Sequence, residues 1–139
     1  MPGFIAHADI DVDASPDRVW QYITTRASEV TFGAQVESDW RPGSPVRWLG
    51  EWEGDSFEDK GEVIEVVAPY RLVLTHYSPR SGDEDVPESY HRITYELSGN
   101  GDGTHLELSQ DGNRSDAAAS ESSANWHRHL EAIKEKAEA

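Results

Sequence analysis

The stretch IAHADIDVDASPDRVWQYIT, residues 5–24, joins an alternating segment directly to a helix with a strong start signal. Alternation with period two predicts a strand with one buried face, and that face carries Ala6, Ala8, Ile10 and Val12. Ser15 is a favourable N-cap, Pro16 suits the first helical position, and Asp17 complements the helix dipole. The chain therefore opens with a half-buried strand that runs straight into a short helix.

The other end of the chain is predicted to form one long helix, from Ser115 to Ala139. Its apolar stripe steps by three and four residues and consists of Ala119, Ser123, Trp126, Leu130, Ile133 and Ala137. The first half of the helix is built mostly from small residues (117–120 and 122–124), and the second half carries bulky ones. The small half either leaves space beneath it or brings the helix closer to its neighbours, and both readings stay open.

Between these helices, β-rich segments alternate with turn-forming ones. We expect a short helix at 27–35, a hairpin over 38–57 with its turn at 41–45, strands at 57–68, 70–77, 89–98 and 104–110, and a polar loop at 78–88. The predicted fold class is α+β, a curved antiparallel sheet of about six to seven strands wrapped around a long C-terminal helix, with one or two short helices after the first strand. No repeat or linker divides the chain, so we expect a single domain over residues 1–139.

The composition excludes several classes of protein and site. The chain has 139 residues, no cysteine and a formal net charge of -15 at pH 7. Disulfides, thiolate zinc sites and thiol nucleophiles are therefore excluded, and nucleic acids and anionic membranes are disfavoured as partners. No apolar run approaches the roughly 20 residues that span a bilayer. The N-terminal MPGFIAHADID lacks the features of a signal peptide, so we expect a cytoplasmic location.

Five segments carry a family resemblance through their order and spacing. They are SPDRVWQYIT (15–24), GSPVRW (43–48), GEVIEVVAPYRLVLTH (61–76), YHRITYELSGNGDGTHLELSQDG (90–112) and NWHRHLEAIK (125–134). Together they cover nearly the whole chain and resemble the START-like (SRPBCC, Bet v1-like) helix-grip superfamily. Within it, the chain looks like the branch named for the activator of Hsp90 ATPase homologue 1 (AHSA1). One departure is that Asn125-Trp126 stands where a late Gly-Trp pair is common.

The resemblance implies a sheet that grips the terminal helix, with a cavity between them. Members of the superfamily bind lipids, sterols, hormones or polyketide intermediates, and some act as cyclases. We therefore expect this chain to bind a small, largely hydrophobic ligand of lipid, polyketide or aromatic type, without a cofactor. Two alternatives stay open: a cyclase-like or hydrolytic enzyme that uses the same cavity, and a protein-interaction module that regulates a chaperone. Homodimerisation is also left open.

Aromatic side chains are the first candidates for the cavity wall, because they offer large apolar area and, for Trp and Tyr, one donor that orients a ligand. The candidate ligand-binding residues are Trp48, Trp52, Phe57, His76, Tyr77, Arg92, Tyr95 and Trp126. His76 follows an apolar run and could anchor a ligand through its ring, although structural histidines are commoner. Arg92 stands at mid-strand, where an inward guanidinium could hold a carboxylate.

No group of residues compels an enzymatic mechanism, so no catalytic residue is assigned. The sequence contains no GxSxG string, no HExxH string and no glycine-rich phosphate loop. His127 and His129 diverge on a helix, so no metal site is predicted. The carboxylates between residues 51 and 59 are expected to form a solvated rim. In the enzymatic alternative, His76, Tyr77 or Arg92 would polarise a carbonyl group of the substrate.

Overall fold

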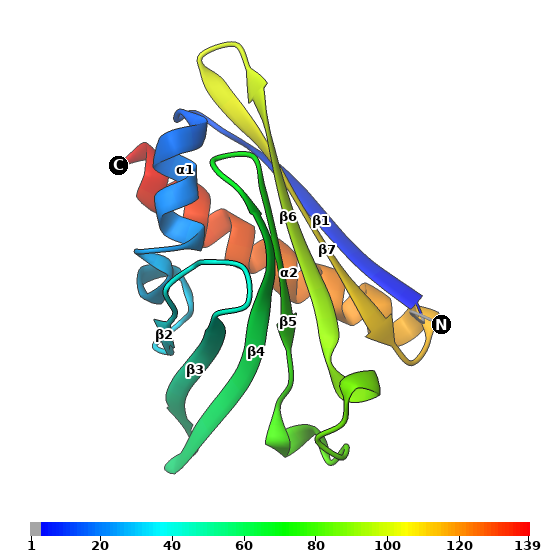
Figure 1. Cartoon of the computed structure of the whole chain (residues 1–139). Helices are drawn as coiled ribbons and strands as arrows, with labels where there is room; N and C mark the ends of the chain where they lie inside the picture. Colours follow the sequence, from blue (N-terminus) through cyan, green and yellow to red (C-terminus); the bar gives the residue numbers. More distant parts are fainter. Residues whose placement is uncertain (1–3) are drawn as a thin grey trace.

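The computed structural model describes residues 4–139, with the side chain of Trp52 outside the described part. Within these residues, seven strands form one antiparallel sheet in the order β1-β7-β6-β5-β4-β3-β2 (Figure 1). The strands are β1 (Phe4–Val12), β2 (Gln35–Glu37), β3 (Pro45–Trp52), β4 (Asp55–Val67), β5 (Arg71–His76), β6 (His91–Asn100) and β7 (Gly103–Asn113). The helices are α1 (Pro16–Ile23) and α2 (Asp116–Glu138), with short 3₁₀ segments η1 (Ala27–Val30), η2 (Pro79–Ser81) and η3 (Pro87–Ser89). The helix-grip prediction is confirmed.

The start of α1 follows the predicted capping pattern. Ser15 Oγ accepts a hydrogen bond from the backbone N–H of Arg18 at 3.3 Å, and Pro16 occupies the first turn. The guanidinium of Arg18 donates to the backbone oxygens of Ala137 and Ala139 at the end of α2. Because the last carbonyls of a helix have no partner within it, the first helix satisfies the end of the last one.

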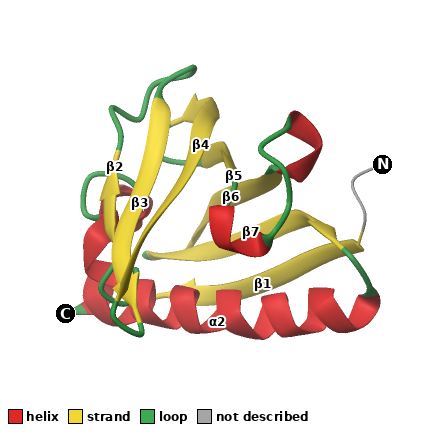
Figure 2. Cartoon of the chain, turned by 90° about the horizontal axis from the view of Figure 1, so that it is seen from below, coloured by secondary structure: helices red, strands yellow, loops and turns green. Residues whose placement is uncertain are grey.

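The helix α2 runs beside β1 and covers the free edge of that strand (Figure 2). Its side chains hydrogen-bond to this edge and its continuation: Ser123 Oγ accepts from His7 N at 2.9 Å, Lys134 Nζ donates to Asp11 O at 2.9 Å, and Glu138 Oε2 accepts from Asp13 N at 2.7 Å. An uncovered edge strand invites pairing with other chains, so α2 protects β1 as well as closing the core. Among the described residues, no helix combines the length and the apolar character that crossing a membrane requires.

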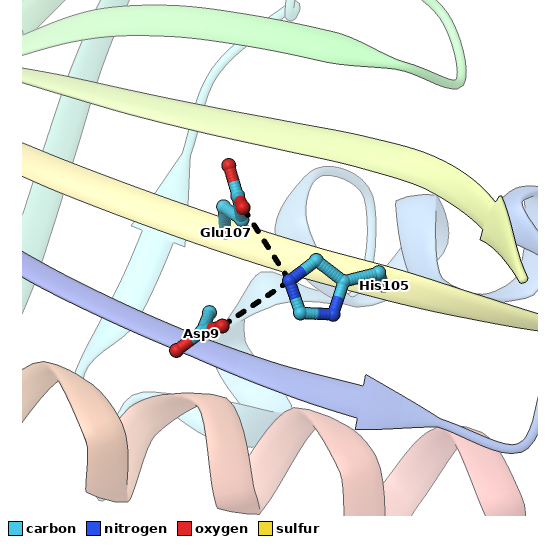
Figure 3. Close-up of side chains that lie close together, drawn as sticks. All are labelled: Asp9, His105 and Glu107. Carbon is cyan, nitrogen blue, oxygen red and sulfur yellow. Dashed lines mark ion pairs between the residues drawn. The ribbon is translucent and has the colours of Figure 1, made fainter.

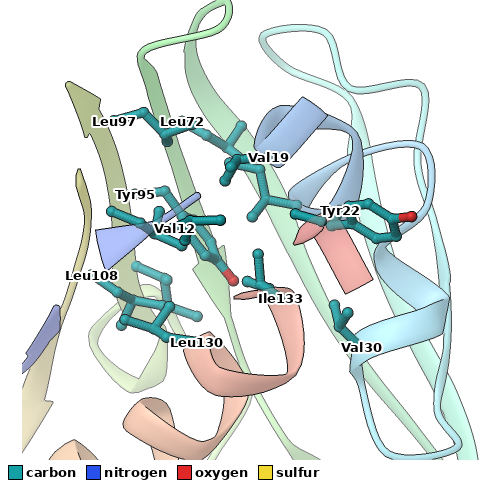
Figure 4. Packing of buried hydrophobic residues seen from close by; sticks show 14 of the residues in the cluster. Val12, Val19, Tyr22, Val30, Leu72, Tyr95, Leu97, Leu108, Leu130 and Ile133 are labelled. Carbon is teal, nitrogen blue, oxygen red and sulfur yellow. The ribbon is translucent and has the colours of Figure 1, made fainter. Parts of the chain in front are cut away.

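The solid part of the core lies where α1 and the C-terminal half of α2 meet the concave face of the sheet (Figure 4). Leu130 and Ile133 of α2 are fully buried, and they belong to one cluster with Val19 of α1 and with Leu72 and Leu108 of the sheet. Burial of such a side chain contributes about 1.5–3 kcal/mol. This cluster is therefore a major source of the stability of the fold.

Small residues bring the first half of α2 close to β1. Ala119 of α2 is buried, and so are Ala6 and Ala8 of β1. The hydrogen bond between His7 N and Ser123 Oγ places the strand backbone within reach of a short helix side chain. The sequence left open whether the small residues leave space beneath the helix or bring it closer to its neighbours, and the structure shows close contact with β1.

The first hairpin begins earlier than the sequence predicts. Its first strand is β2, which ends at Glu37, and residues 38–44 form the connection to β3. Within that connection Trp40 has a φ of 57°, which interrupts an extended strand. The predicted strand segment at the start of 38–57 is therefore replaced by a turn.

The short helix predicted at 27–35 is also shorter in the structure. It is a single 3₁₀ turn that ends at Val30. Phe32 and Gly33 follow with φ values of 52° and 97°, both in the left-handed region, where a right-handed helix does not continue. The chain then turns into β2.

Candidate functional site

A cavity of about 440 Å³ lies between the concave face of the sheet, the segment that contains α1 and η1, and the middle of α2. It is partly open to solvent. Most of its lining side chains are apolar or aromatic, and they include Tyr22, Ile23, Val36, Trp40, Trp48, Phe57, Leu74, Ile93, Tyr95 and Trp126. The polar lining residues include Asp59, His76, Arg80, Asn125, Arg128 and His129.

The wall formed by β3 and β4 depends on a glycine. Strand alternation turns Trp48 and Gly50 of β3 toward the concave face, together with Phe57 and Asp59 of β4. Gly50 lies opposite Phe57 in the strand register, and a Cβ atom on Gly50 would come within 2.8 Å of the Phe57 ring. The missing side chain therefore leaves room for the ring to lie against β3 and line the cavity.

Two aromatic residues at the rim have backbone conformations that bulky residues rarely adopt. Phe32 lies before β2 with a φ of 52°, and Trp40 lies after it with a φ of 57°. The left-handed region costs a non-glycine residue about 1–2 kcal/mol. Both side chains line the cavity, and Phe32 is 74% exposed. The fold thus holds two rings at the cavity rim in a strained backbone.

The first polar pair in the cavity joins β4 to β5. His76 Nε2 lies 2.9 Å from Oδ2 of Asp59, and the Trp48 ring meets the His76 ring edge to face, with centroids 4.8 Å apart. Asp59 is buried, with 8% of its surface exposed. Burial by itself would raise the pKa of Asp59, but the hydrogen bond with His76, with contributions from Ser78 and Arg80, outweighs burial and holds this pKa below its ordinary value. Asp59 is therefore an ionised hydrogen-bond acceptor.

The second polar pair joins β6 to α2. The Tyr95 hydroxyl donates to Nε2 of His129 at 3.0 Å, and Nδ1 of His129 donates to the backbone oxygen of Val30 at 3.0 Å. This assignment follows because a carbonyl oxygen only accepts. Burial lowers the pKa of His129 and raises the pKa of Tyr95, so both groups are neutral. Trp126 packs against the His129 ring and donates to Gln110 Oε1 at 2.7 Å.

The structure brings five of the eight candidate residues to this cavity: Trp48, Phe57, His76, Tyr95 and Trp126. They come from four different strands and from α2, and alternation along each strand explains why their side chains share the concave side. The side chain of Trp52 lies outside the described residues, so its predicted place at the cavity stays a prediction.

Tyr77 and Arg92 lie away from the cavity, which corrects their expected placement. The Tyr77 hydroxyl donates to the backbone oxygen of Asp83 at 2.7 Å, and its ring stacks on Tyr90 with centroids 5.2 Å apart. Tyr77 therefore supports the loop after β5. Arg92 is exposed on the convex face, because it alternates with the buried Ile93 along β6.

Sequence reasoning missed several polar residues of the cavity, among them Asp59 and His129, which pair with His76 and Tyr95. The sequence places Asp59 in a solvated rim, yet the structure buries it, because it shares the concave face of β4 with Phe57 and Val63. The two-residue alternation from Phe57 was the available signal. His129 lies three residues after Trp126, on the same side of α2, and this helical spacing could have identified it.

A separate charged cluster lies on the convex face, where Asp9 of β1 meets His105 and Glu107 of β7 (Figure 3). His105 Nε2 lies 3.2 Å from Asp9 Oδ2 and 3.4 Å from Glu107 Oε1, and Nδ1 lies 2.8 Å from Asp11 Oδ1. The hydrogen bond with Asp11, aided by the neighbouring carboxylates, raises the pKa of His105. The three side chains in Figure 3 are close enough to contact one metal ion, but exposed acidic groups often gather without one. When His105 is protonated, its charge offsets part of the negative charge of Asp9, Asp11 and Glu107.

Comparisons with solved structures show which proteins share this fold. The solution structure of ChR145 from Cytophaga hutchinsonii is 34% identical, covers 98% of this chain and 94% of its own, and superposes with a TM-score of 0.85. DynU16, described as a putative protein in the dynemicin biosynthetic locus, is 19% identical with a TM-score of 0.73, and the match covers 96% of this chain and 47% of that chain. The Aha1 dimer from Colwellia psychrerythraea is 15% identical with a TM-score of 0.74, and coverage is 97% and 96%. The last two likenesses concern the fold alone.

The family comparison is more specific than the fold. A search of curated proteins found no match. The family model described as Activator of Hsp90 ATPase homolog 1-like protein matches residues 13–138, which is most of the chain. The match begins just after β1 and runs to the end of α2, so it includes strands β2 to β7, both helices and the residues that line the cavity. The chain therefore belongs to the family of Activator of Hsp90 ATPase homolog 1-like proteins.

Proposed function

We propose that this protein binds a small, largely apolar ligand in the cavity between the sheet and α2. The observation that carries the proposal is the cavity of about 440 Å³, which the aromatic side chains line without filling. Ligand pockets commonly measure about 300–1,000 Å³ and combine apolar walls with a few polar groups. The apolar and aromatic lining distinguishes this cavity from the other hollows of the surface, which charged and polar residues line more heavily.

The lining favours an aromatic ligand within the lipid, polyketide or aromatic range. Trp40, Trp48 and Phe57 offer flat surfaces from three neighbouring segments, and Trp126 offers another from α2. Offset or edge-to-face contacts between rings add about 0.5–1.5 kcal/mol to simple burial. One structural neighbour, DynU16, is described as a protein of the dynemicin biosynthetic locus, which supports a role beside small molecules.

The direct test is binding of a neutral apolar probe, N-phenylnaphthylamine, followed by its fluorescence and by isothermal titration calorimetry. Trp48→Ala is expected to weaken binding by about 2 kcal/mol, roughly a thirtyfold rise in Kd, because it removes a central ring. Ala34→Trp is expected to abolish binding, because Ala34 lines the cavity and a large ring there would fill it.

The matched control for the second variant is Ala117→Trp, which adds the same ring at an exposed position of α2. This variant should bind the probe as the unmodified protein does. Equal loss of binding in both tryptophan variants, or unchanged affinity in both cavity variants, would remove the cavity as the site.

Homodimerisation, a single domain and a cytoplasmic location stay predictions. Analytical ultracentrifugation would test the first of them.

A further inference from the structure

The cavity contains two histidines, and they differ in what they leave free. His129 uses both ring nitrogens within the protein, one toward Tyr95 and one toward the backbone of Val30. His76 uses Nε2 toward Asp59, while its Nδ1 makes no hydrogen bond with the described residues. Nδ1 is also accessible to solvent, and the His76 ring lines the cavity. The lining therefore offers one unused ring nitrogen.

The chemistry of that nitrogen follows from its neighbour. Asp59 is buried and ionised, so its carboxylate only accepts hydrogen bonds. The proton between the two groups at 2.9 Å must then lie on Nε2 of His76. In the neutral imidazole, one nitrogen carries the proton and the other carries a lone pair. Whenever the ring is neutral, Nδ1 of His76 is therefore an acceptor.

Asp59 distinguishes this end of the cavity from an ordinary hydrophobic core. Its Oδ1 atom is buried without a hydrogen-bond partner in the described part of the chain. A buried acceptor without a partner is costly, and an ionised one more so. A carboxylate that served only to complete the core would be a poor choice here. Its hydrogen bond to His76 instead fixes the tautomer and the orientation of the ring, as partners of functional histidines do.

We propose that the ligand carries a hydroxyl group on its apolar framework and that this hydroxyl donates a hydrogen bond to Nδ1 of His76. The inference rests on the proposed function and names the chemistry of the ligand at that site. Asp59 acts as a positioning residue, and Trp48 limits the movement of the His76 ring from the other side. Phenols and hydroxylated polycyclic compounds have this combination of flat apolar area and a neutral donor.

Other polar groups fit this site less well. A carboxylate at Nδ1 of the neutral ring would face a lone pair and lie near the ionised Asp59, so Arg80 and Arg128, which also line the cavity, would have to offset both. A group that only accepts hydrogen bonds would face the lone pair of Nδ1. An ammonium group would have to leave water for a mostly apolar cavity, which costs far more than burying a hydroxyl. A neutral donor satisfies the acceptor without that cost.

The test compares naphthol with its methyl ether, which keeps the aromatic framework but has no donor. A net hydrogen bond between neutral groups corresponds to a roughly three- to tenfold difference in affinity. We expect naphthol to bind more tightly than the ether by this factor, as measured by isothermal titration calorimetry. His76→Phe should abolish the preference while the ether binds as before. His127→Phe, the same substitution at an exposed position of α2, should leave the preference intact.

A second variant and a spectroscopic measurement keep the proposal falsifiable if His76→Phe does not fold. Asn in Asp59→Asn can donate or accept, so it no longer fixes the tautomer, and the preference for naphthol should shrink. The NMR chemical shifts of the imidazole nitrogens report the tautomer directly. In the unmodified protein Nε2 should be protonated, and Nδ1 should change its shift on addition of naphthol but not of the ether.

The outcomes separate this inference from the proposed function. Equal binding of both probes to the unmodified protein would overturn the role of His76 but would support an apolar binding site. Retention of the naphthol preference in folded His76→Phe would overturn the inference as well. Failure of both probes and of N-phenylnaphthylamine to bind the folded protein would overturn the proposed function itself.

Discussion

The helix α2 meets the sheet in two different ways along its length. Near its C-terminal end, Leu130 and Ile133 are sealed against α1 and the sheet with no exposed surface. At its middle, Trp126 and His129 border an open cavity. β1 stays beside the helix, whereas β3 and β4 rise away from it (Figure 2). The sheet therefore packs densely against α2 where the two lie close together, and it leaves a cavity where the strands diverge from the helix.

The largest effect is expected in the densely packed region. Leu130→Ala should lower the free energy of unfolding by about 2–5 kcal/mol, because a fully buried side chain is lost and its place cannot collapse. Val36→Ala, at the cavity wall, should cost less than about 1.5 kcal/mol, because part of its surface already faces space. Urea unfolding followed by circular dichroism measures both. Equal losses would mean that the two regions are packed alike.

The buried His129 makes the cavity region sensitive to acid. Burial lowers the pKa of His129 in the folded protein below the ordinary 6.5. As the pH falls below that value, the unfolded chain takes up a proton that the folded protein resists, so stability declines until the folded pKa is passed. His129→Gln, which does not titrate, should lose less stability than the unmodified protein between about pH 7.5 and about pH 5. Urea unfolding at the two pH values measures this difference.

His105 on the convex face should show the opposite dependence of stability on pH, so it serves as a control for His129. The hydrogen bond with Asp11 raises the pKa of His105 above 6.5. Its stabilising contribution is therefore fully present below pH 6.5 and is lost as the pH rises through the folded pKa. His105→Gln should destabilise the protein more at about pH 5 than at about pH 8.5. A variant series in which both histidines shift stability in the same direction would contradict this assignment.

A smaller effect is expected at the strained rim of the cavity. Phe32→Gly should raise the free energy of unfolding by up to about 1 kcal/mol, because glycine adopts a positive φ without steric cost. The same change should weaken ligand binding, because the exposed ring at the rim is lost. Phe32→Ala is the control, since it removes the ring but keeps the strain. If glycine and alanine variants are equally stable, the backbone at Phe32 is not strained.

The smallest effect is expected on the convex face of β6. Arg92→Ala should change the free energy of unfolding by less than about 0.5 kcal/mol, because the side chain is exposed. It should also leave the Kd for N-phenylnaphthylamine unchanged, because the side chain lies away from the cavity. A marked loss of binding would show that the convex face takes part in ligand recognition.

Local sequence signals predicted some parts of this structure well. The Ser15 cap, the alternation in residues 5–13 and the stripe through Leu130 all concern neighbours within one element, and the chain itself fixes their spacing. The start of the first hairpin was less predictable. The residues before Trp40 have no decisive strand preference. β2 forms through its pairing with β3, in which Val36 lies opposite Trp48.

In the candidate site, too, some features could be predicted from the sequence and others could not. Aromatic residues on predicted strands were recognisable as a wall, because alternation assigns them to a face. The burial of Asp59 and its pairing with His76 were not recognisable in this way. The two residues are 17 positions apart, and their contact depends on the lateral order of β4 and β5. Tyr77 illustrates the reverse case: Leu74 and His76 occupy the concave face of β5, so alternation turns the next residue away from the cavity.

The sequence by itself determined most of the elements, their order and most of the faces they would bury, because capping and periodicity act within a few residues. Only the tertiary structure decided that the sheet and α2 leave a cavity, which side chains surround it, and which histidine keeps a free nitrogen. These properties depend on how strongly the sheet curves away from one helix. Curvature is set by all seven strands together, and no single segment encodes it.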